Sequence, residues 1–222
     1  MNFDVVSAAL WALPLLLAVI CHEVAHGYVA YRLGDRTAAA LGRLTLNPIP
    51  HIDPVGTILL PGLLMLTHAP FLFGYAKPVP VNWRNLRHPT RDMVLVAAAG
   101  PLTNFALAAI SGIAGTLLLA LVNRTAAADA HVVQAGFAVV EPLALMARFS
   151  VRINVMLGVF NLLPIPPLDG GRVAVGLLPS EIAGLLARVE PFGFLIVLAL
   201  IMTGSLRFLW PVTRALEHTL GF

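Results

Sequence analysis

The sequence has few charged residues and almost no cysteine. Only 11% of its 222 residues are charged, whereas 59% are apolar, and Lys77 is the only lysine. So little polar surface cannot cover a soluble domain, and the composition therefore indicates a membrane protein. Because Cys21 is the only cysteine, an intramolecular disulfide is excluded, and we expect Cys21 to be a buried, unreactive thiol. No basic stripe interleaved with aromatic residues is present, which argues against nucleic-acid binding.

Long apolar runs predict an all-α polytopic membrane protein, a helical bundle of about five to six membrane segments. Residues 5–31 can form a helix long enough to cross a hydrocarbon core of about 30 Å, and they lack the basic leader and cleavage site of a signal peptide. Further spans are expected at 93–122, 136–163 and 191–210, with a weaker amphipathic helix at 173–188. Residues 55–73 are apolar but interrupted by prolines, and predict either a kinked span or a re-entrant hairpin.

Two segments between the apolar runs lack helical signals. Residues 42–53 are rich in Asn and Pro and predict a loop or a short strand. In Ala76-Lys77-Pro78-Val79-Pro80-Val81-Asn82, two prolines prevent a regular helix. A short strand or strand-like edge is therefore expected there.

The distribution of arginine predicts the orientation of the chain. Asp4 alone precedes the first span, whereas Arg32, Arg36 and Arg43 follow it. Positive residues favour the cytoplasmic side, so we expect the N-terminus outside. Arg148 and Arg152 lie within the span at 136–163. Because charged residues at membrane depth are costly, they are expected to face a polar cavity or a helix end.

His22, Glu23 and His26 form the motif His-Glu-x-x-His within the first predicted helix. Two histidines four positions apart project from one helical face and can share a metal, while the adjacent glutamate can act as a general base. Each ionisable group in a membrane helix costs about 2.5 to 3.5 kcal/mol on insertion scales. Three such groups therefore indicate a metallohydrolase centre, although hydrogen bonding within the bundle is the structural alternative.

A catalytic zinc site needs a third protein ligand. The remaining histidines, His51, His68, His88, His131 and His218, lie in or beside predicted loops and bends and are interpreted as surface or capping residues. Asp169 follows a helix broken by three prolines and precedes two glycines, which permit a tight backbone that turns a carboxylate inward. The alternative is that Asp169 caps a helix starting near Arg172.

Five motifs, in this order, resemble the site-two protease family of intramembrane zinc metalloproteases. They are His22-Glu23-x-x-His26, Gly42 to Pro48 with His51-Ile52-Asp53-Pro54, Lys77 to Asn82, Ala99 to Asn104, and Asn161 to Gly170. The resemblance implies a single metalloprotease domain over 1–222 with its core motifs at 22–172. It implies one zinc ion per chain, held by His22, His26 and Asp169, with Glu23 as general base.

The resemblance also implies how a substrate is held. It makes Asn161 a polar contact for the substrate or oxyanion and Asn104 a weaker second contact, with interhelical hydrogen bonds as the alternative role of both. Lys77, Pro78, Val79, Pro80 and Val81 offer an edge to which an unwound substrate could bind by strand addition, the alternative being a structural hairpin or surface loop.

These features predict hydrolysis of a peptide bond within or near a transmembrane segment of a membrane-protein substrate. The other expected partner is the lipid bilayer, with an oligomer or a separate regulatory protein as a further possibility, because no PDZ or nucleotide-sensing CBS domain accompanies the core. The expected location is the bacterial cell (inner) membrane, with the active site toward the cytoplasm. Two alternatives remain: a metal-binding membrane transporter, which would be expected to show paired half-repeats, and a catalytically silent membrane binder.

Overall fold

The computed structural model describes residues 5–67, 74–125 and 130–221, and this part of the chain is helical without a β-strand. The α-helices are α1 (Val5–Arg32), α2 (Thr37–Ala40), α3 (Leu60–Leu66), α4 (Pro89–Thr125), α5 (Ala130–Asn161), α6 (Asp169–Leu177), α7 (Ser180–Val189), α8 (Gly193–Met202) and α9 (Leu209–Thr219). Shorter turns are the 3-10 helices Ile49–His51, Trp83–Asn85, Glu190–Phe192 and Ser205–Phe208, and the π-helix Pro54–Leu59. The predicted all-α class is confirmed.

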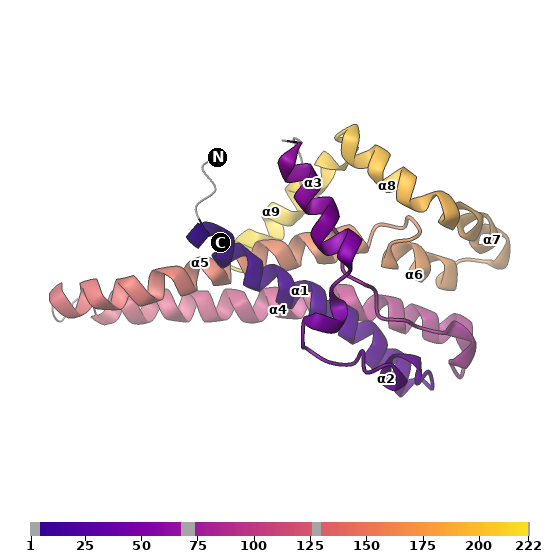
Figure 1. Cartoon of the computed structure of the whole chain (residues 1–222), viewed down its shortest axis with the longest axis horizontal. Coiled ribbons are helices and arrows are strands. Elements are labelled where there is room, and N and C mark those ends of the chain that lie inside the picture. Colours follow the sequence, from indigo (N-terminus) through magenta and orange to yellow (C-terminus); the bar gives the residue numbers. More distant parts are fainter. Residues whose placement is uncertain (1–4, 68–73, 126–129, 222) are drawn as a thin grey trace.

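Helices α4 and α5 form a long antiparallel pair that extends beyond the other helices (Figure 1). Helix α1 packs against both of them, α6 packs against α4, and α9 packs against α5. One buried cluster joins Ala108 of α4 to Val151 and Val155 of α5. Small side chains at such contacts let membrane helices approach closely. This three-helix core positions the polar residues described below.

Four helical stretches of the described residues have the length and apolar composition of membrane spans: Leu10–Arg32, Pro89–Leu121, Val140–Asn161 and Ser180–Met202. The expected spans at 5–31, 93–122 and 136–163 are therefore confirmed, whereas the expected count of five to six is not. Helical turns at Pro54–Leu66 are apolar, but at about 1.5 Å per residue they reach only about 20 Å, less than the hydrocarbon core. Residues 68–73 of the predicted hairpin lie outside the described residues.

The predictions for the C-terminal third were wrong in their boundaries. The expected helix at 173–188 is two helices, because Leu178 precedes a proline and takes an extended conformation (ψ 155°) between α6 and α7. The expected span at 191–210 ends at Met202 of α8. Gly204 then adopts a left-handed conformation (φ 68°), which turns the chain away. The apolar stretch that could span the membrane instead consists of α7 and α8, from Ser180 to Met202.

The predicted strand around Val79 is absent, and the segment at residues 77–81, here called the extended segment, is held mainly by side chains. Arg43 donates hydrogen bonds to the carbonyl oxygens of Lys77 (2.8 Å) and Pro78 (3.1 Å). The amide of Lys77 donates to the carbonyl of His51 (2.9 Å). Of the two forms expected here, a regular strand is absent because the backbone groups pair with a guanidinium and a loop, not with a second strand, whereas a strand-like edge stays a prediction. Residues 42–53 were predicted to form a loop or a short strand, and they form a loop with one helical turn.

Asp35 fixes the far end of the extended segment, just beyond α1. Its buried carboxylate accepts the amide of Asn82 (2.7 Å), the side-chain amide of Asn85 (2.9 Å) and both the amide and hydroxyl of Thr37 (3.1 and 2.5 Å). Burial acts to raise the pKa of Asp35, but the hydrogen bonds together outweigh burial and hold that pKa below its ordinary value of 3.8. This role of Asp35 was not predicted from the sequence.

Two smaller expectations have opposite outcomes. Cys21 is partly exposed rather than buried. Arg148 and Arg152 do line a polar cavity, together with Arg214, Glu217 and His218 of the C-terminal region, as their position within a span predicted.

Candidate metal centre

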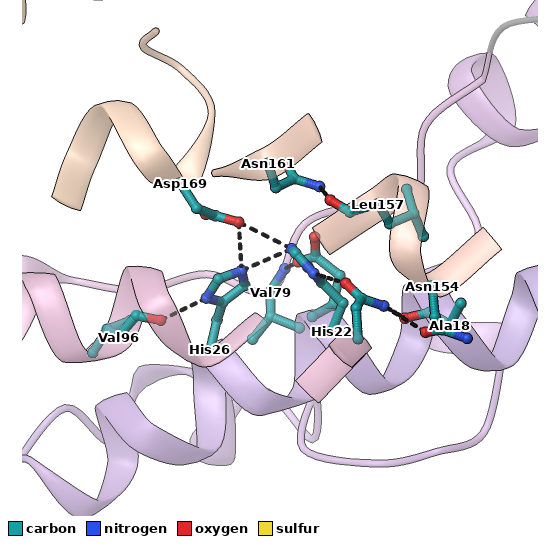
Figure 2. Close-up of polar contacts among 11 residues, drawn as sticks. Ala18, His22, His26, Val79, Val96, Asn154, Leu157, Asn161 and Asp169 are labelled. Atoms are coloured by element: carbon teal, nitrogen blue, oxygen red, sulfur yellow. Dashed lines mark hydrogen bonds and ion pairs between the residues drawn. The ribbon is translucent and has the colours of Figure 1, made fainter. Parts of the chain in front are cut away.

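Three side chains converge where α1 meets the start of α6. The Nε2 atoms of His22 and His26 lie 3.0 Å apart, and they lie 3.1 and 3.3 Å from Oδ2 of Asp169 (Figure 2). The two histidines are one helical turn apart on α1, which places both rings on one face. Helix α6 begins at Asp169 itself, with Leu168 as its N-cap, so the alternative in which Asp169 caps a helix near Arg172 is wrong.

The hydrogen bonds of Asn104 determine which nitrogen of His22 carries the proton. The Nδ2 group of Asn104 donates to the carbonyl of Ala18 (3.2 Å) and to Oδ1 of Asn154 (2.8 Å). Its own Oδ1 therefore faces Nδ1 of His22, at 2.6 Å. An amide oxygen can only accept a hydrogen bond, so this network assigns the proton to Nδ1 of His22 and leaves the Nε2 lone pair free.

His26 is oriented in the same way by the backbone of α4. Its Nδ1 lies 2.7 Å from the carbonyl oxygen of Val96, which can only accept a hydrogen bond. Nδ1 must therefore be the donor, and Nε2 again presents a lone pair. Both histidines thus direct an unprotonated nitrogen toward the same carboxylate oxygen.

This donor set fits zinc. Two nitrogen lone pairs and one carboxylate oxygen face one another, and Oδ2 of Asp169 is buried without a hydrogen-bond partner in the described part of the chain. Such a cluster of acceptors is favourable only around a cation. Ligand atoms bound tetrahedrally to zinc at about 2.0 to 2.2 Å lie about 3.3 to 3.6 Å from one another, so the observed separations of 3.0 to 3.3 Å are within a few tenths of an ångström of that arrangement.

Gly100 of α4 leaves the space in which these atoms meet. A Cβ atom at Gly100 would lie 2.4 Å from Nε2 of His26 and 2.6 Å from Nε2 of His22. Both distances are too short for a normal contact, so a side chain at this position would force the two imidazole rings to move. Gly100 belongs to the motif Ala99 to Asn104, but no role was predicted for it. A glycine inside an apolar helix, next to Pro101, is the signal of close approach that could have identified it.

A cavity of about 350 Å³ opens onto the three converging side chains. Its walls include His22, Glu23, His26, Asp169 and Asn161, together with Pro78, Val79 and Val81 of the extended segment. Lys77 and Pro80 belong to the same segment but do not line the cavity. Asn104 does not line it either, because its side chain is fully buried beneath His22. Most of the predicted site residues are therefore brought together, and Asn104 is set behind them.

Glu23 is held against the extended segment. Its Oε2 accepts the backbone amide of Val79 at 2.8 Å, whereas its other carboxylate oxygen makes no hydrogen bond in the part of the chain that the structure describes. Asn161, at the end of α5, donates through Nδ2 to the carbonyl of Leu157 (3.0 Å). A primary amide has two N–H groups, so the second can serve another acceptor in the cavity.

Comparison with known proteins agrees with this centre: the chain belongs to peptidase family M50, whose model matches residues 10–204. It is 40% identical over 205 residues to "Putative zinc metalloprotease YwhC" of Bacillus subtilis, covering 91% of this chain and 85% of that protein. It is 33% identical to "Putative zinc metalloprotease Rip2" of Mycolicibacterium smegmatis, over 86% of this chain and 66% of that protein. No solved structure matches the chain.

Proposed function

We propose that this chain hydrolyses a peptide bond within or near a transmembrane segment of a membrane-protein substrate. Its family makes it a zinc metalloprotease, and its apolar helices make it an integral membrane protein. The observation that carries the proposal is the position of the centre. His22 and His26 lie inside the candidate span Leu10–Arg32, so the cavity they line lies at membrane depth.

His22, His26 and Asp169 would hold one zinc ion per chain. Zinc in such a site supplies a Lewis acid that polarises a carbonyl and lowers the pKa of water. Glu23 lines the same cavity and acts as the general base, taking the proton of the attacking water and delivering it to the leaving amine. The hydrogen bond from Val79 holds one oxygen of Glu23, and the other oxygen is the one that receives the proton.

Asn161 contacts the substrate carbonyl in this proposal. Asn161 lies in the wall of the cavity, and in this proposal its second N–H group stabilises negative charge that develops on a carbonyl oxygen. Asn104 has both its N–H groups and its oxygen engaged within the core. We therefore assign Asn104 to the orientation of His22 in place of the substrate contact expected from its motif.

The extended segment is the proposed binding edge for an unwound substrate. Neither the carbonyl of Val79 nor the amide of Val81 makes a hydrogen bond among the described residues. In extended backbone, residues two apart direct their polar groups to the same side. These groups therefore face the side on which Val79 meets Glu23, and strand addition there would satisfy backbone groups of a substrate in a water-poor site.

The remaining proposals concern the surroundings of the centre. We place it toward the cytoplasm of a bacterial cell (inner) membrane, because Arg32, Arg36 and Arg43 follow the first span. The apolar turns at Pro54–Leu66 enter the membrane without crossing it. Substrate choice is assigned to an oligomer or a separate regulatory protein.

The two alternative functions do not account for the whole site. A transporter would not require a glutamate beside two metal ligands, and a silent binder would not require the ligands and the base to be present together.

Glu23→Gln tests the mechanism, since it keeps the size and hydrogen bonding of the side chain but removes the proton acceptor. Purified variant should retain about one zinc equivalent while cleavage of a model transmembrane substrate falls by about 10² to 10⁴-fold. Glu181→Gln on the exposed face of α7 is the matched control and should cleave normally. Cleavage by Glu23→Gln at the wild-type rate would refute the proposal.

A further inference from the structure

A second polar cavity lies between α5 and α9, away from the metal centre. It has a volume of about 230 Å³ and is lined by Arg148, Val151, Arg152, Arg214, Glu217 and His218. Arg148 is eight residues inside the candidate span Val140–Asn161, which is about 12 Å from the start of that span. The cavity therefore opens on the side of a membrane helix, where lipid reaches the protein.

The charges of this cavity are not balanced. Nε of Arg152 lies 3.6 Å from Oε2 of Glu217, and this is the cavity's one ion pair among the described residues. Arg214 lies over the ring of Trp210 at 5.8 Å, and Arg148 has no hydrogen bond or ion pair within the described part of the chain. Three guanidinium groups thus meet one carboxylate. An excess of positive charge at this depth is costly unless an anion binds to it.

The shape of α9 presents these cations to the bilayer. Leu209 and Thr213 are buried on the protein side of the helix. Trp210, Arg214 and His218 are exposed and follow one another at four-residue spacing, so they form a stripe on a second face. On α5, Phe149 stacks against Trp11 of α1 with ring centroids 4.3 Å apart. Tryptophan favours the interface between lipid tails and headgroups, and Trp11 is one residue inside the candidate span that starts at Leu10. A long arginine side chain beside Phe149 can therefore extend from within the span toward headgroup level.

From these observations we infer that the cavity between α5 and α9 binds the phosphate headgroup of an anionic membrane lipid. Planar guanidinium groups match the oxygen atoms of a phosphodiester and can each donate two hydrogen bonds. Basic pockets between membrane helices are suited to such headgroups. The exposed side chain of Trp210, on the same face of α9 as Arg214, supplies an apolar surface for an acyl chain.

The test uses the full chain in a neutral detergent with phosphatidylglycerol as the probe. Phosphatidylglycerol should raise the thermal unfolding midpoint, and native mass spectrometry should detect a retained lipid, whereas phosphatidylcholine with the same acyl chains should do neither. This comparison requires no variant. Equal stabilisation by the two lipids would overturn the inference. Equal stabilisation by inorganic phosphate alone would overturn the assignment to a lipid.

Variants identify the residues involved. Arg148→Gln combined with Arg214→Gln should weaken phosphatidylglycerol binding by at least about tenfold while zinc content stays unchanged. Arg148→Lys, which retains a charge but loses the planar fork, should bind with intermediate affinity. The matched control is Arg188→Gln, an exposed arginine on α7, which should bind as the wild type does. If the control lost as much affinity as the double variant, net charge and not this cavity would be responsible, and the inference would fail.

Discussion

The backbone amide of Val79 donates a hydrogen bond to Oε2 of Glu23 at 2.8 Å. The general base proposed for hydrolysis is therefore attached to the segment proposed to bind the substrate. Arg43 and Asp35 hold that segment from its two ends. A change in its position would consequently alter both substrate binding and the orientation of Glu23, and a test of substrate binding must leave the hydrogen bond from Val79 intact.

Val81→Pro separates these two effects. The amide of Val81 has no partner among the described residues, and the preceding residue is already a proline. The substitution therefore removes a free donor, together with a valine side chain that packs against a buried cluster. We expect cleavage of an intact transmembrane substrate to fall by about tenfold, and cleavage of a short unstructured peptide to fall much less, since loss of one hydrogen bond in a desolvated site costs about 1 to 3 kcal/mol.

Val81→Ala is the control for this prediction, because it shortens the same side chain but keeps the N–H group. Parallel kinetics of the three proteins on both substrates measure the difference. Equal losses on the intact substrate and the peptide would point to misfolding and against strand addition.

Asn104→Leu should weaken zinc binding by about 10 to 100-fold, the usual cost of losing a partner that orients a metal-binding histidine. Leucine has a similar size but cannot accept the Nδ1 proton of His22. Zinc affinity is measured by competition with a chelator. Ser111→Ala removes the hydrogen bond between Ser111 and Ser150, at the far end of the same polar network, and should leave zinc affinity unchanged. A similar loss of affinity in both variants would assign the effect to general destabilisation.

Gly100→Ala should abolish zinc binding while the protein remains folded. The added methyl group would lie 2.4 Å from Nε2 of His26, whereas alanine inside a helix is otherwise favoured over glycine by up to about 1 kcal/mol. Zinc content and far-UV circular dichroism are the measurements. Gly184→Ala in α7, where a Cβ would meet nothing within 4 Å, is the control. A full zinc equivalent in Gly100→Ala would show that the site does not lie above this glycine.

Asp35→Asn should destabilise the protein at neutral pH by about 1.5 to 3 kcal/mol, the worth of hydrogen bonds to a charged group. Because the folded state holds the pKa of Asp35 below 3.8, the carboxylate stabilises the fold above that value, and the contribution is lost as pH falls through the lowered pKa. Thermal unfolding in detergent should therefore show a gap between wild type and variant that narrows below about pH 3.8. A gap of constant size across this range would contradict the assignment.

The sequence predicted those parts of the site that depend on local spacing. His22, Glu23 and His26 lie within one helical turn, so their juxtaposition follows from the helix alone, and Asp169 is marked by the prolines and glycines around it. The contact between His22 and Asn104 spans 82 positions and two helices. Predicting it requires the rotation of α1 against α4, which apolar periodicity cannot supply when both helices are apolar on nearly every face.

The wrong predictions at residues 77–81 and in the C-terminal region also arose because the sequence does not show which segments the fold brings together. Alternating proline and valine at residues 78–81 correctly indicated that no helix forms there, but whether such a backbone pairs with a strand or with Arg43 depends on what the fold brings beside it. In the C-terminal region, hydropathy continued past Met202 and hid the turn at Gly204. Composition could not reveal that this one glycine adopts a left-handed conformation.

The three proposed ligands come from the two ends of a long stretch of chain, since about 140 residues separate His26 from Asp169. A single ion bound to both would act as a cross-link that closes this loop, and closing a long loop removes more entropy from the unfolded chain than closing a short one. Helices α4 and α5 lie inside the loop, whereas α7, α8 and α9 follow it. Removal of the ion would therefore remove the cross-link between α1 and α6 and leave α6 held by its packing against α4, so that chelation loosens the start of α6 before it disturbs the pair formed by α4 and α5.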